Sequence, residues 1–243
     1  GTATAVGGFA NIENIIGGFG FDTLVGPDAD ATWDLTDLNA GSVAGVSFTY
    51  IETLSGGFGD DAFVFSGGSV VGLVDGGAGA DTLDYAAYTT GITVDLAAGT
   101  ATAVGGFAEI ENVIGGTGAD VLVGPDADAT WTIGGPNAVI IEGVYFAEIE
   151  NLFGGSGADT FVFSGGSVAS IDGGAGADTL DYAAYNTGIT VDLAAGTATA
   201  VGGFAIIENV IGGSGSDSIL GPDADAIWDI TGSNAGDVAG VSF

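Results

Sequence analysis

Short runs of alternating apolar and polar residues recur along this chain, separated by glycine. Ile92, Val94 and Leu96 alternate with polar residues, and residues 160–163 read Thr-Phe-Val-Phe. A two-residue period is typical of β-strands, in which successive side chains point to opposite faces. The 48 glycines argue against helices, whose interiors glycine destabilises. The pattern therefore predicts an all-β fold of short strands.

The chain is internally repetitive. Gly1, Gly99 and Gly196 each open the same ten residues, GTATAVGGFA. These starts define long repeats 1–98, 99–195 and a partial repeat 196–243. Near-identical repeats of short strands are typical of solenoids, in which each unit stacks on the next. We therefore expect residues 1–243 to form a single continuous solenoid.

A second, shorter repeat is the turn motif GGxGxD, which occurs seven times. Its copies are separated by a shorter or a longer spacing, which are one and two multiples of roughly 19.5. The spacing predicts a parallel β-solenoid, similar to a β-roll, with coils of roughly 19 to 20 residues and roughly twelve coils. The motifs are residues 17–22, 56–61, 76–81, 115–120, 154–159, 173–178 and 212–217.

The charge of the chain excludes several classes of partner. It has 32 acidic residues, no lysine, arginine or histidine, and a net charge of −32. Nucleic-acid binding is not expected, because phosphate contacts need basic side chains. An anionic membrane surface would repel the chain, and no apolar run reaches the roughly 18 residues of a membrane-inserted helix. The hydrophobic content of 47% distinguishes the chain from a disordered acidic tail.

The GGxGxD turn has the chemistry of a calcium ligand. Its three glycines can adopt positive φ angles and so turn backbone carbonyls toward one point beside a carboxylate. Calcium prefers such hard oxygen ligands and tolerates an irregular shell of six to eight of them. Stacked turns would bring carboxylates together, and at roughly 5 Å they would repel by about 1 kcal/mol even in water. The chain has no cationic side chain to relieve that repulsion.

These motifs resemble a known family. Residues 154–162, GGSGADTFV, are similar to the nonapeptide of the repeats-in-toxin (RTX) calcium-binding proteins, and the linking phrase 190–199 followed by 207–209 resembles segments of long bacterial proteins of that kind. The resemblance spans essentially the whole chain. It implies a secreted, extracellular β-roll that folds when calcium enters its turns, with each ion held between turns on successive coils.

The motif spacing departs from the tandem arrangement of that family. Turns two coils apart would lie roughly 9 to 10 Å from each other, too far to share an ion. Only two pairs fall on adjacent coils, and we predict their aspartates to be the best calcium ligands: Asp61 with Asp81, and Asp159 with Asp178. Asp22, Asp120 and Asp217 are predicted half-sites. The glycines predicted to supply the turns are Gly56, Gly57, Gly59, Gly76, Gly77, Gly79, Gly154, Gly155, Gly157, Gly173, Gly174 and Gly176.

The alternative for every one of these turns is a purely structural corner, in which aspartate accepts turn hydrogen bonds. Two further repeated features leave similar alternatives. The sequence Gly-Pro-Asp-Ala-Asp at 26–30, 124–128 and 221–225 is a corner or a weaker second cation site. The Ile-Glu-Asn segment at 12–14, 110–112, 149–151 and 207–209, which recurs as Ile-Glu-Thr at 51–53, suggests a stacked asparagine ladder.

Three classes of function follow. An enzyme is not expected: the chain lacks histidine, cysteine, lysine and arginine, and its candidate acids recur in near-identical copies, whereas an active site is singular. An adhesin stalk that binds carbohydrate through repeated aromatics, such as Trp33, Trp131 and Tyr85, is the alternative. The favoured function is a structural calcium-binding repeat of an extracellular filament, sheath or surface layer. Because the ends of a solenoid expose strand edges, we expect it to self-assemble end to end.

Overall fold

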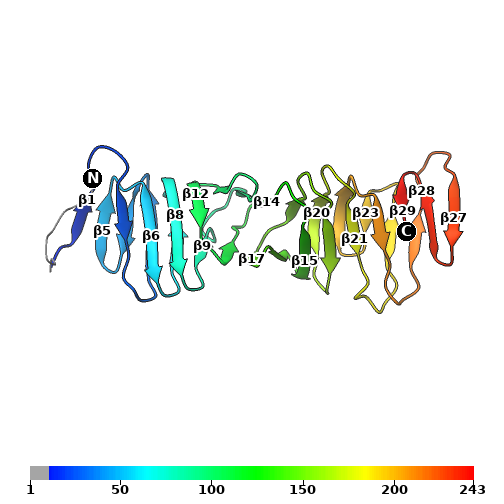
Figure 1. Ribbon diagram of the computed structural model, residues 1–243, viewed down its shortest axis with the longest axis horizontal. Helices are drawn as coiled ribbons and strands as arrows, with labels where there is room; N and C mark the ends of the chain where they lie inside the picture. Colours follow the sequence, from blue (N-terminus) through cyan, green and yellow to red (C-terminus); the bar gives the residue numbers. More distant parts are fainter. Residues whose placement is uncertain (1–10) are drawn as a thin grey trace. The chain divides into compact units, whose positions relative to one another are not determined.

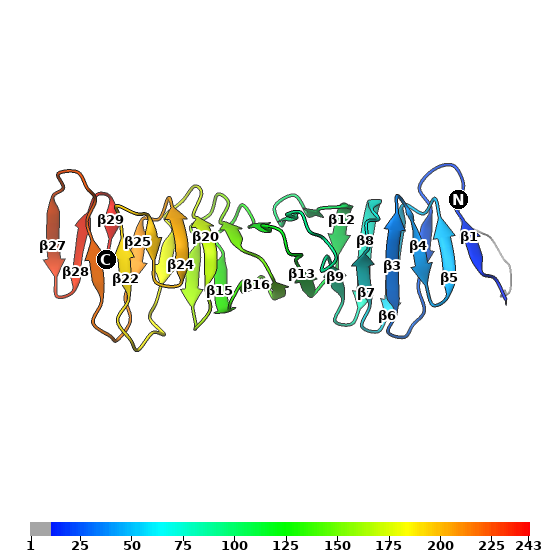
Figure 2. The same cartoon turned by 180° about the vertical axis from the view of Figure 1, so that it is seen from behind.

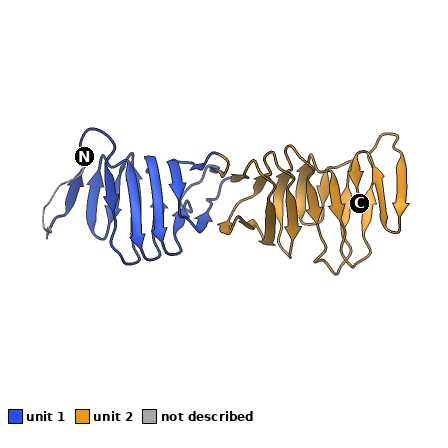
Figure 3. Ribbon diagram, in the orientation of Figure 1, with its two compact units in different colours: residues 1–94, 98–119 blue, residues 95–97, 120–243 orange. Residues whose placement is uncertain are grey.

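The computed structural model describes residues 11–243, so the first ten residues of the first long repeat lie outside the described residues. All regular structure in residues 11–243 is β, in 29 strands. No helix among these residues could therefore cross a membrane. The chain divides into two compact units (Figure 3). Unit 1 comprises the residues up to Val94 and residues 98–119, and unit 2 comprises residues 95–97 and 120–243.

Unit 1 consists of two sheets, which Figure 1 and Figure 2 show from opposite sides. The first sheet has the strand order β1 (Asn14–Ile16), β5 (Val46–Thr49), β4 (Ala40–Val43), β3 (Thr32–Asp37), β7 (Ala62–Phe65), β9 (Thr82–Asp84) and β13 (Asn112–Ile114). The second has the order β2 (Thr23–Val25), β6 (Thr53–Phe58), β8 (Val70–Ala78), β12 (Val104–Ala108), β11 (Thr100–Ala101) and β10 (Thr93–Asp95).

Unit 2 repeats this two-sheet arrangement. Its first sheet has the order β17 (Val144–Ala147), β16 (Ala138–Ile141), β15 (Thr130–Gly135), β19 (Thr160–Phe163), β21 (Thr179–Asp181), β25 (Asn209–Ile211), β29 (Val241–Ser242), β28 (Ala235–Val238) and β27 (Trp228–Gly232). Its second has the order β14 (Val121–Val123), β18 (Asn151–Phe153), β20 (Val168–Asp172), β24 (Val201–Ala205), β23 (Thr197–Ala198), β22 (Thr190–Asp192) and β26 (Ser218–Leu220).

The simplest coils follow the predicted path. From β6 in the second sheet the chain turns to β7 in the first, returns to β8 in the second and turns again to β9 in the first. Both resulting pairs are parallel, with Phe63 opposite Leu83 and Leu54 opposite Val74. The prediction of an all-β, parallel β-solenoid is confirmed.

Other coils contain a three-stranded antiparallel meander that the sequence analysis did not predict. Strands β3, β4 and β5 fold back and forth within the first sheet, and β10, β11 and β12 do so within the second. Unit 2 has equivalent meanders, for example β15, β16 and β17. Each meander fills two extra positions in a sheet before the solenoid path continues.

The meanders make the predicted coil count wrong: the described residues form about eight turns rather than roughly twelve. Stacked positions are 20 residues apart between Asp61 and Asp81, but 30 apart between Ala31 and Asp61, where a meander intervenes. A coil that contains a meander thus spans 30 residues, and one without a meander spans 20. The longer motif spacing therefore corresponds to one coil with a meander plus half of a coil without one. The two equal coils predicted for this spacing are therefore not present among the described residues.

Stacked aromatic rings fill the core of each unit. In unit 1, Trp33 lies on Phe63 with ring centroids 5.4 Å apart, and Phe65 lies on Tyr85 at 4.5 Å. The same contacts recur in unit 2 between Trp131 and Phe161 at 5.3 Å and between Phe163 and Tyr182 at 4.6 Å. All eight side chains are fully buried. The stacks hold successive coils in register, which places the turns at the sheet edges directly above one another.

Candidate metal centre

The seven GGxGxD turns lie at two different edges of the solenoid. The four turns of the predicted pairs, 56–61, 76–81, 154–159 and 173–178, lead from the second sheet to the first. The turns 17–22, 115–120 and 212–217 lead from the first sheet to the second. Motifs separated by the longer spacing are therefore on opposite edges. This explains why two motifs of a pair stack directly on each other, whereas the isolated motifs do not stack on another GGxGxD turn.

Each pair belongs to a stack of four turns, which we call the motif column. In unit 1 the column consists of the corner 26–31, the motifs 56–61 and 76–81, and the loop 106–111. In unit 2 it consists of 124–129, 154–159, 173–178 and 203–208. The first and last loops of each column lack the GGxGxD motif.

A ladder of hydrogen bonds runs through the column of unit 1. The Ala31 N–H donates to Asp61 Oδ1 at 2.9 Å, the Asp61 N–H to Asp81 Oδ1 at 2.7 Å, and the Asp81 N–H to Glu111 Oε2 at 2.8 Å. Each carboxylate thus accepts a backbone N–H from the preceding coil. The ladder fixes one oxygen of each motif aspartate.

The same ladder is present in unit 2. The Ala129 N–H donates to Asp159 Oδ1 at 3.0 Å, the Asp159 N–H to Asp178 Oδ1 at 2.8 Å, and the Asp178 N–H to Glu208 Oε2 at 2.9 Å. The arrangement is therefore a property of the repeat.

The second carboxylate oxygen of each of these aspartates is buried without a partner. Asp61, Asp81, Asp159 and Asp178 are at most 1% exposed, and the Oδ2 atom of each accepts no hydrogen bond. Leaving a buried polar atom unpaired costs about 1 to 3 kcal/mol, and more when the group is charged. A cation beside Oδ2 would remove that cost.

Each Oδ2 points to the first glycine of its own motif, where a carbonyl from the following coil also points. At Gly56, a Cβ atom would collide with Asp61 Oδ2 and with the carbonyl oxygen of Gly76. At Gly154 it would lie 2.6 Å from Asp159 Oδ2 and collide with the carbonyl of Gly173. We call this close approach of one carboxylate oxygen and one carbonyl oxygen to the first glycine a cradle. It leaves no room for a side chain on that glycine.

The remaining glycines shape the turn. Gly57, Gly59, Gly77, Gly79, Gly155, Gly174 and Gly176 have φ between 89° and 149°, a region that side chains disfavour. The first glycines, Gly56, Gly76, Gly154 and Gly173, are required instead for space. Gly157 also lies against the preceding coil, at the backbone of Ala127 and Asp128.

Burial perturbs the four paired aspartates. Desolvation raises the pKa of Asp159 to about 6, and the nearby charge of Asp178 acts in the same direction, whereas the Ala129 N–H opposes the rise. The nearby Trp131 indole also opposes it, although its N–H does not reach hydrogen-bond geometry with the carboxylate. Desolvation also raises the pKa values of Asp61, Asp81 and Asp178. Without a bound cation, these sites therefore favour the protonated carboxyl more than an exposed aspartate does.

The donor set fits calcium. Among residues 11–243, no three acidic side chains come close enough to hold a metal by themselves. A site here must combine one carboxylate with backbone carbonyls, and calcium accepts such mixed oxygen shells at about 2.3 to 2.6 Å. Metals that prefer nitrogen or sulfur find no ligand, because the chain has no histidine or cysteine.

The three predicted half-sites lie outside the motif columns, although a Cβ at Gly17 would likewise lie 2.9 Å from Asp22 Oδ2 and collide with the carbonyl of Tyr50. Asp22 Oδ2 accepts the Gly18 N–H at 2.6 Å, so this oxygen already has a partner. Asp217 Oδ1 accepts the Ile189 N–H at 3.0 Å, and the Asp120 N–H donates to Glu150 Oε2 at 2.9 Å. The turns of Asp22, Asp120 and Asp217 are not brought into a motif column.

Sequence reasoning missed the role of the glutamate in the Ile-Glu-Asn segments and in their Ile-Glu-Thr counterpart. Glu52, Glu111, Glu150 and Glu208 each accept the backbone N–H of a motif aspartate 30 residues earlier. Where asparagine follows, it donates to the carbonyl of that same aspartate, as Asn151 does to Asp120 at 3.1 Å. Together the two side chains clamp the backbone of the motif aspartate. The constant spacing was the signal that could have revealed the clamp.

The Gly-Pro-Asp-Ala-Asp corners act as the first layer of the motif columns. Asp30 Oδ1 accepts the Asp60 N–H at 3.0 Å, and Asp128 Oδ1 accepts the Ala158 N–H at 2.9 Å. Both aspartates are exposed, and these bonds tie the corner to the motif below it. The contacts match the corner interpretation of the segment.

The fold and the columns define a class of protein: a β-solenoid built from stacked glycine–aspartate turns. Residues 68–173 and 167–237 match the family described as Peptidase M10 serralysin C terminal, which covers more than half of the chain. The chain belongs to this family, the RTX repeat region of serralysin-type proteins, and the resemblance seen in its motifs is confirmed. No curated protein matches the chain.

Proposed function

We propose that this chain is a structural, calcium-binding β-solenoid repeat of an extracellular bacterial filament, sheath or surface layer. The observation that carries the proposal is the buried, unpartnered Oδ2 of Asp61, Asp81, Asp159 and Asp178, each facing a backbone carbonyl of the next coil. The RTX repeat family is known to bind calcium. Here the ion would join two coils, so binding would stabilise the stack itself.

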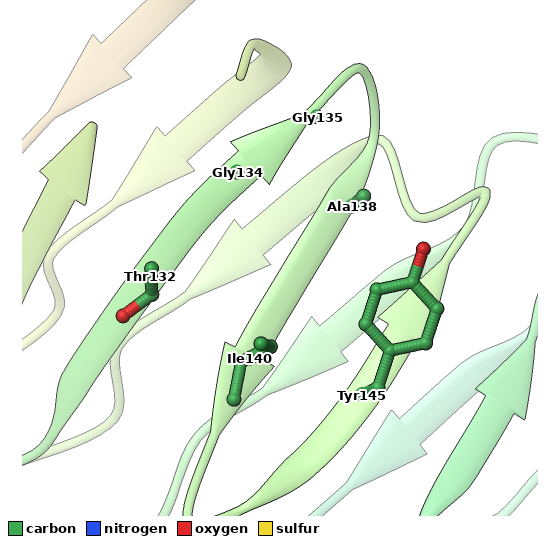
Figure 4. A pocket seen from close by; sticks show the side chains of 6 residues that line it. All are labelled: Thr132, Gly134, Gly135, Ala138, Ile140 and Tyr145. Carbon is green, nitrogen blue, oxygen red and sulfur yellow. The ribbon is translucent and has the colours of Figure 1, made fainter. Parts of the chain in front are cut away.

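A non-enzymatic role is supported by the repetition of the site and by the family. The matching family region is the non-catalytic repeat region of serralysin-type proteases. A hollow of about 210 Å³ on the β15–β16–β17 meander is lined by Thr132, Gly134, Gly135, Ala138, Ile140 and Tyr145 (Figure 4). No carboxylate lines this hollow. A larger hollow near β26 is lined by several residues, and Asp217 is the one carboxylate among them. Glycoside hydrolysis, the chemistry open to a chain of carboxylates, needs two.

An extracellular location is consistent with this chemistry. RTX repeat proteins are typically secreted. A sheet of stacked carboxylates without any basic residue folds most readily where divalent cations are abundant, because a ligand that binds only the folded state shifts the equilibrium toward it.

End-to-end assembly is supported by the outermost strands of unit 2. Trp228 and Ile230 on β27 are 44% and 66% exposed, whereas the equivalent residues of β15, Trp131 and Ile133, are fully buried. Strand edges of this type can pair with a further coil. We propose a coil of another copy, or of a longer chain, as that partner.

The aromatic residues do not favour the adhesin alternative. Trp33, Trp131, Tyr85 and Tyr182 are fully buried, so their faces cannot stack on a sugar. Tyr88 and Tyr185 are half-buried and lie edge-on against Tyr85 and Tyr182. These aromatics serve the core, whereas Trp228, on the outermost strand β27, is 44% exposed.

The proposed function is tested by titrating the calcium-stripped chain with calcium while following circular dichroism and light scattering. Strand signal and scattering that rise together would support a calcium-folded, self-assembling solenoid. Complete strand signal in chelator, unchanged by calcium, would contradict the calcium role. Calcium-induced folding with no scattering would support the metal site but contradict assembly.

A further inference from the structure

We infer that each motif column holds two separate calcium ions, and that the second is completed by a coil that has no GGxGxD motif. The second site combines Asp81 with the backbone carbonyl of Glu109 in unit 1, and Asp178 with that of Ile206 in unit 2. This inference rests on the proposed calcium-binding function and specifies its stoichiometry and ligands.

The two oxygens of each motif carboxylate point toward different coils. Within a column, Oδ1 of each motif aspartate faces the preceding coil, from which it accepts an N–H. Oδ2 faces the first glycine of its own motif and the carbonyl of the following coil. Asp61 and Asp81 therefore point into successive cradles rather than toward one shared point.

The second cradle of each column lies at Gly76 in unit 1 and at Gly173 in unit 2. At Gly76, a Cβ would lie 2.5 Å from Asp81 Oδ2 and would collide with the carbonyl oxygen of Glu109. At Gly173 it would lie 2.5 Å from Asp178 Oδ2 and collide with the carbonyl of Ile206. These contacts repeat those at Gly56 and Gly154, with a carbonyl of the loop 106–111 or 203–208 in place of a motif glycine.

The backbone of Glu109 and of Ile206 is held in an unusual conformation that presents the carbonyl to the cradle. Glu109 and Ile206 have φ angles of 49° and 51°, in the left-handed region that non-glycine residues seldom occupy. Such a conformation persists only where the surroundings impose it. The clamps Glu111 and Glu208, which bond to the Asp81 and Asp178 N–H groups, hold the following coil in place.

The side chains of Glu109 and Ile206 are not part of the proposed site. Glutamate in unit 1 and isoleucine in unit 2 adopt the same backbone and present the same oxygen, and Ile206 is 54% exposed. The ligand is thus the carbonyl, which sequence motifs cannot reveal. The buried, unpartnered Oδ2 of Asp81 and Asp178 is the independent sign that something binds there.

The test counts bound calcium per chain by equilibrium dialysis and elemental analysis. The variants are Asp61→Asn, Asp81→Asn and the double variant, because an asparagine oxygen can still accept the ladder N–H while its amide group replaces Oδ2. Two separate sites predict a loss of one ion in each single variant and two in the double. One shared ion predicts the same single loss in all three, which would overturn the inference.

Unit 2 provides an independent test that leaves every carboxylate intact. Ile206→Gly and Ile206→Glu keep the left-handed backbone accessible or restore the residue of unit 1, and both should retain every ion. Ile206→Pro excludes the left-handed backbone, because the proline ring holds φ at a negative value, so it should lose one ion and weaken no other. Retention of all ions by a folded Ile206→Pro chain would contradict the carbonyl ligand.

Asp60→Asn is the charge-matched control, because Asp60 is an exposed neighbour of Asp61 whose Oδ1 accepts the Ala80 N–H. It should bind as many ions as the parent chain. If the parent chain binds no calcium at all, the proposed function fails; if it binds calcium but the variants show one shared ion per column, only the inference fails.

Discussion

At the scale of the residue, the two oxygens of a motif aspartate have different roles. In Asp159, Oδ1 belongs to the hydrogen-bond ladder, whereas Oδ2 is buried without a partner. The first oxygen contributes a hydrogen bond to the fold, whereas the second is a buried, unpaired group that destabilises the fold and that the proposed cation would compensate. Replacing the whole side chain therefore mixes two effects, and only measurements with and without calcium separate them.

The paired aspartates should matter more than an isolated one. We expect Asp159→Ala with Asp178→Ala to remove most of the calcium-dependent stabilisation of unit 2, about 2.7 kcal/mol for each ion at a calcium concentration of 100 Kd. Asp22→Ala should remove much less, because Asp22 Oδ2 already accepts the Gly18 N–H. Urea unfolding in calcium and in chelator measures the difference. Equal losses in the two variants would refute the distinction between the edges.

The raised pKa of Asp159 predicts how the calcium-free chain responds to pH. Its folded-state pKa of about 6 exceeds the ordinary aspartate value of 3.8, so ionisation is penalised in the folded state. The penalty is complete above pH 6 and is relieved as the pH falls through 6 toward 4. The calcium-stripped chain should therefore be more stable at pH 5 than at pH 7.

Asp159→Asn isolates this contribution from the general relief of negative charge. The variant should show a smaller gain between pH 7 and pH 5 than the parent chain, measured by urea unfolding of calcium-stripped samples. An identical gain would show that Asp159 does not titrate in this range.

At the scale of the element, the sequence predicted the strands but not the meanders. Alternating residues such as Phe63 and Phe65 do line the core, as their two-residue period requires. The predicted number of coils was wrong because the longer motif spacing has no unique division, and only the pairing partners show that β4 and β5 run back within one sheet. The unpaired Oδ2 atoms depend on the register of stacked turns, which no single motif encodes.

The glutamate clamp gives a prediction at this scale. Glu208→Ala removes the acceptor of the Asp178 N–H and should cost about 1 to 3 kcal/mol. The loss should occur in chelator as well as in calcium, since the bond does not involve the metal. Glu208→Gln, which keeps an acceptor oxygen, is the matched control and should lose less. Urea unfolding of the three chains measures the effect; a loss seen only in calcium would assign Glu208 to the metal site.

At the scale of the whole molecule, negative charge dominates. The chain has a net charge of −32 and no basic residue, so no internal ion pair can offset the repulsion between stacked coils. The hydrophobic core and backbone ladders must hold the coils together against it. The proposed cations between coils would act at the places where carboxylates are most deeply buried.

Chelation should therefore lower the melting temperature of the whole chain sharply. Calorimetry in excess chelator and in calcium checks this, with magnesium as the control because its strict octahedral geometry suits carbonyl cradles poorly. An unchanged melting temperature in chelator would remove the calcium role. Equal stabilisation by magnesium would point to nonspecific screening of charge.

The ladder also sets an order of events in time. A motif aspartate takes its N–H partner from the coil before it and its cradle carbonyl from the coil after it. No cradle is complete while only one of its two coils has formed. Under the proposed calcium binding, each ion would therefore bind only after the next coil has formed, and the ions would be taken up one after another along the growing stack.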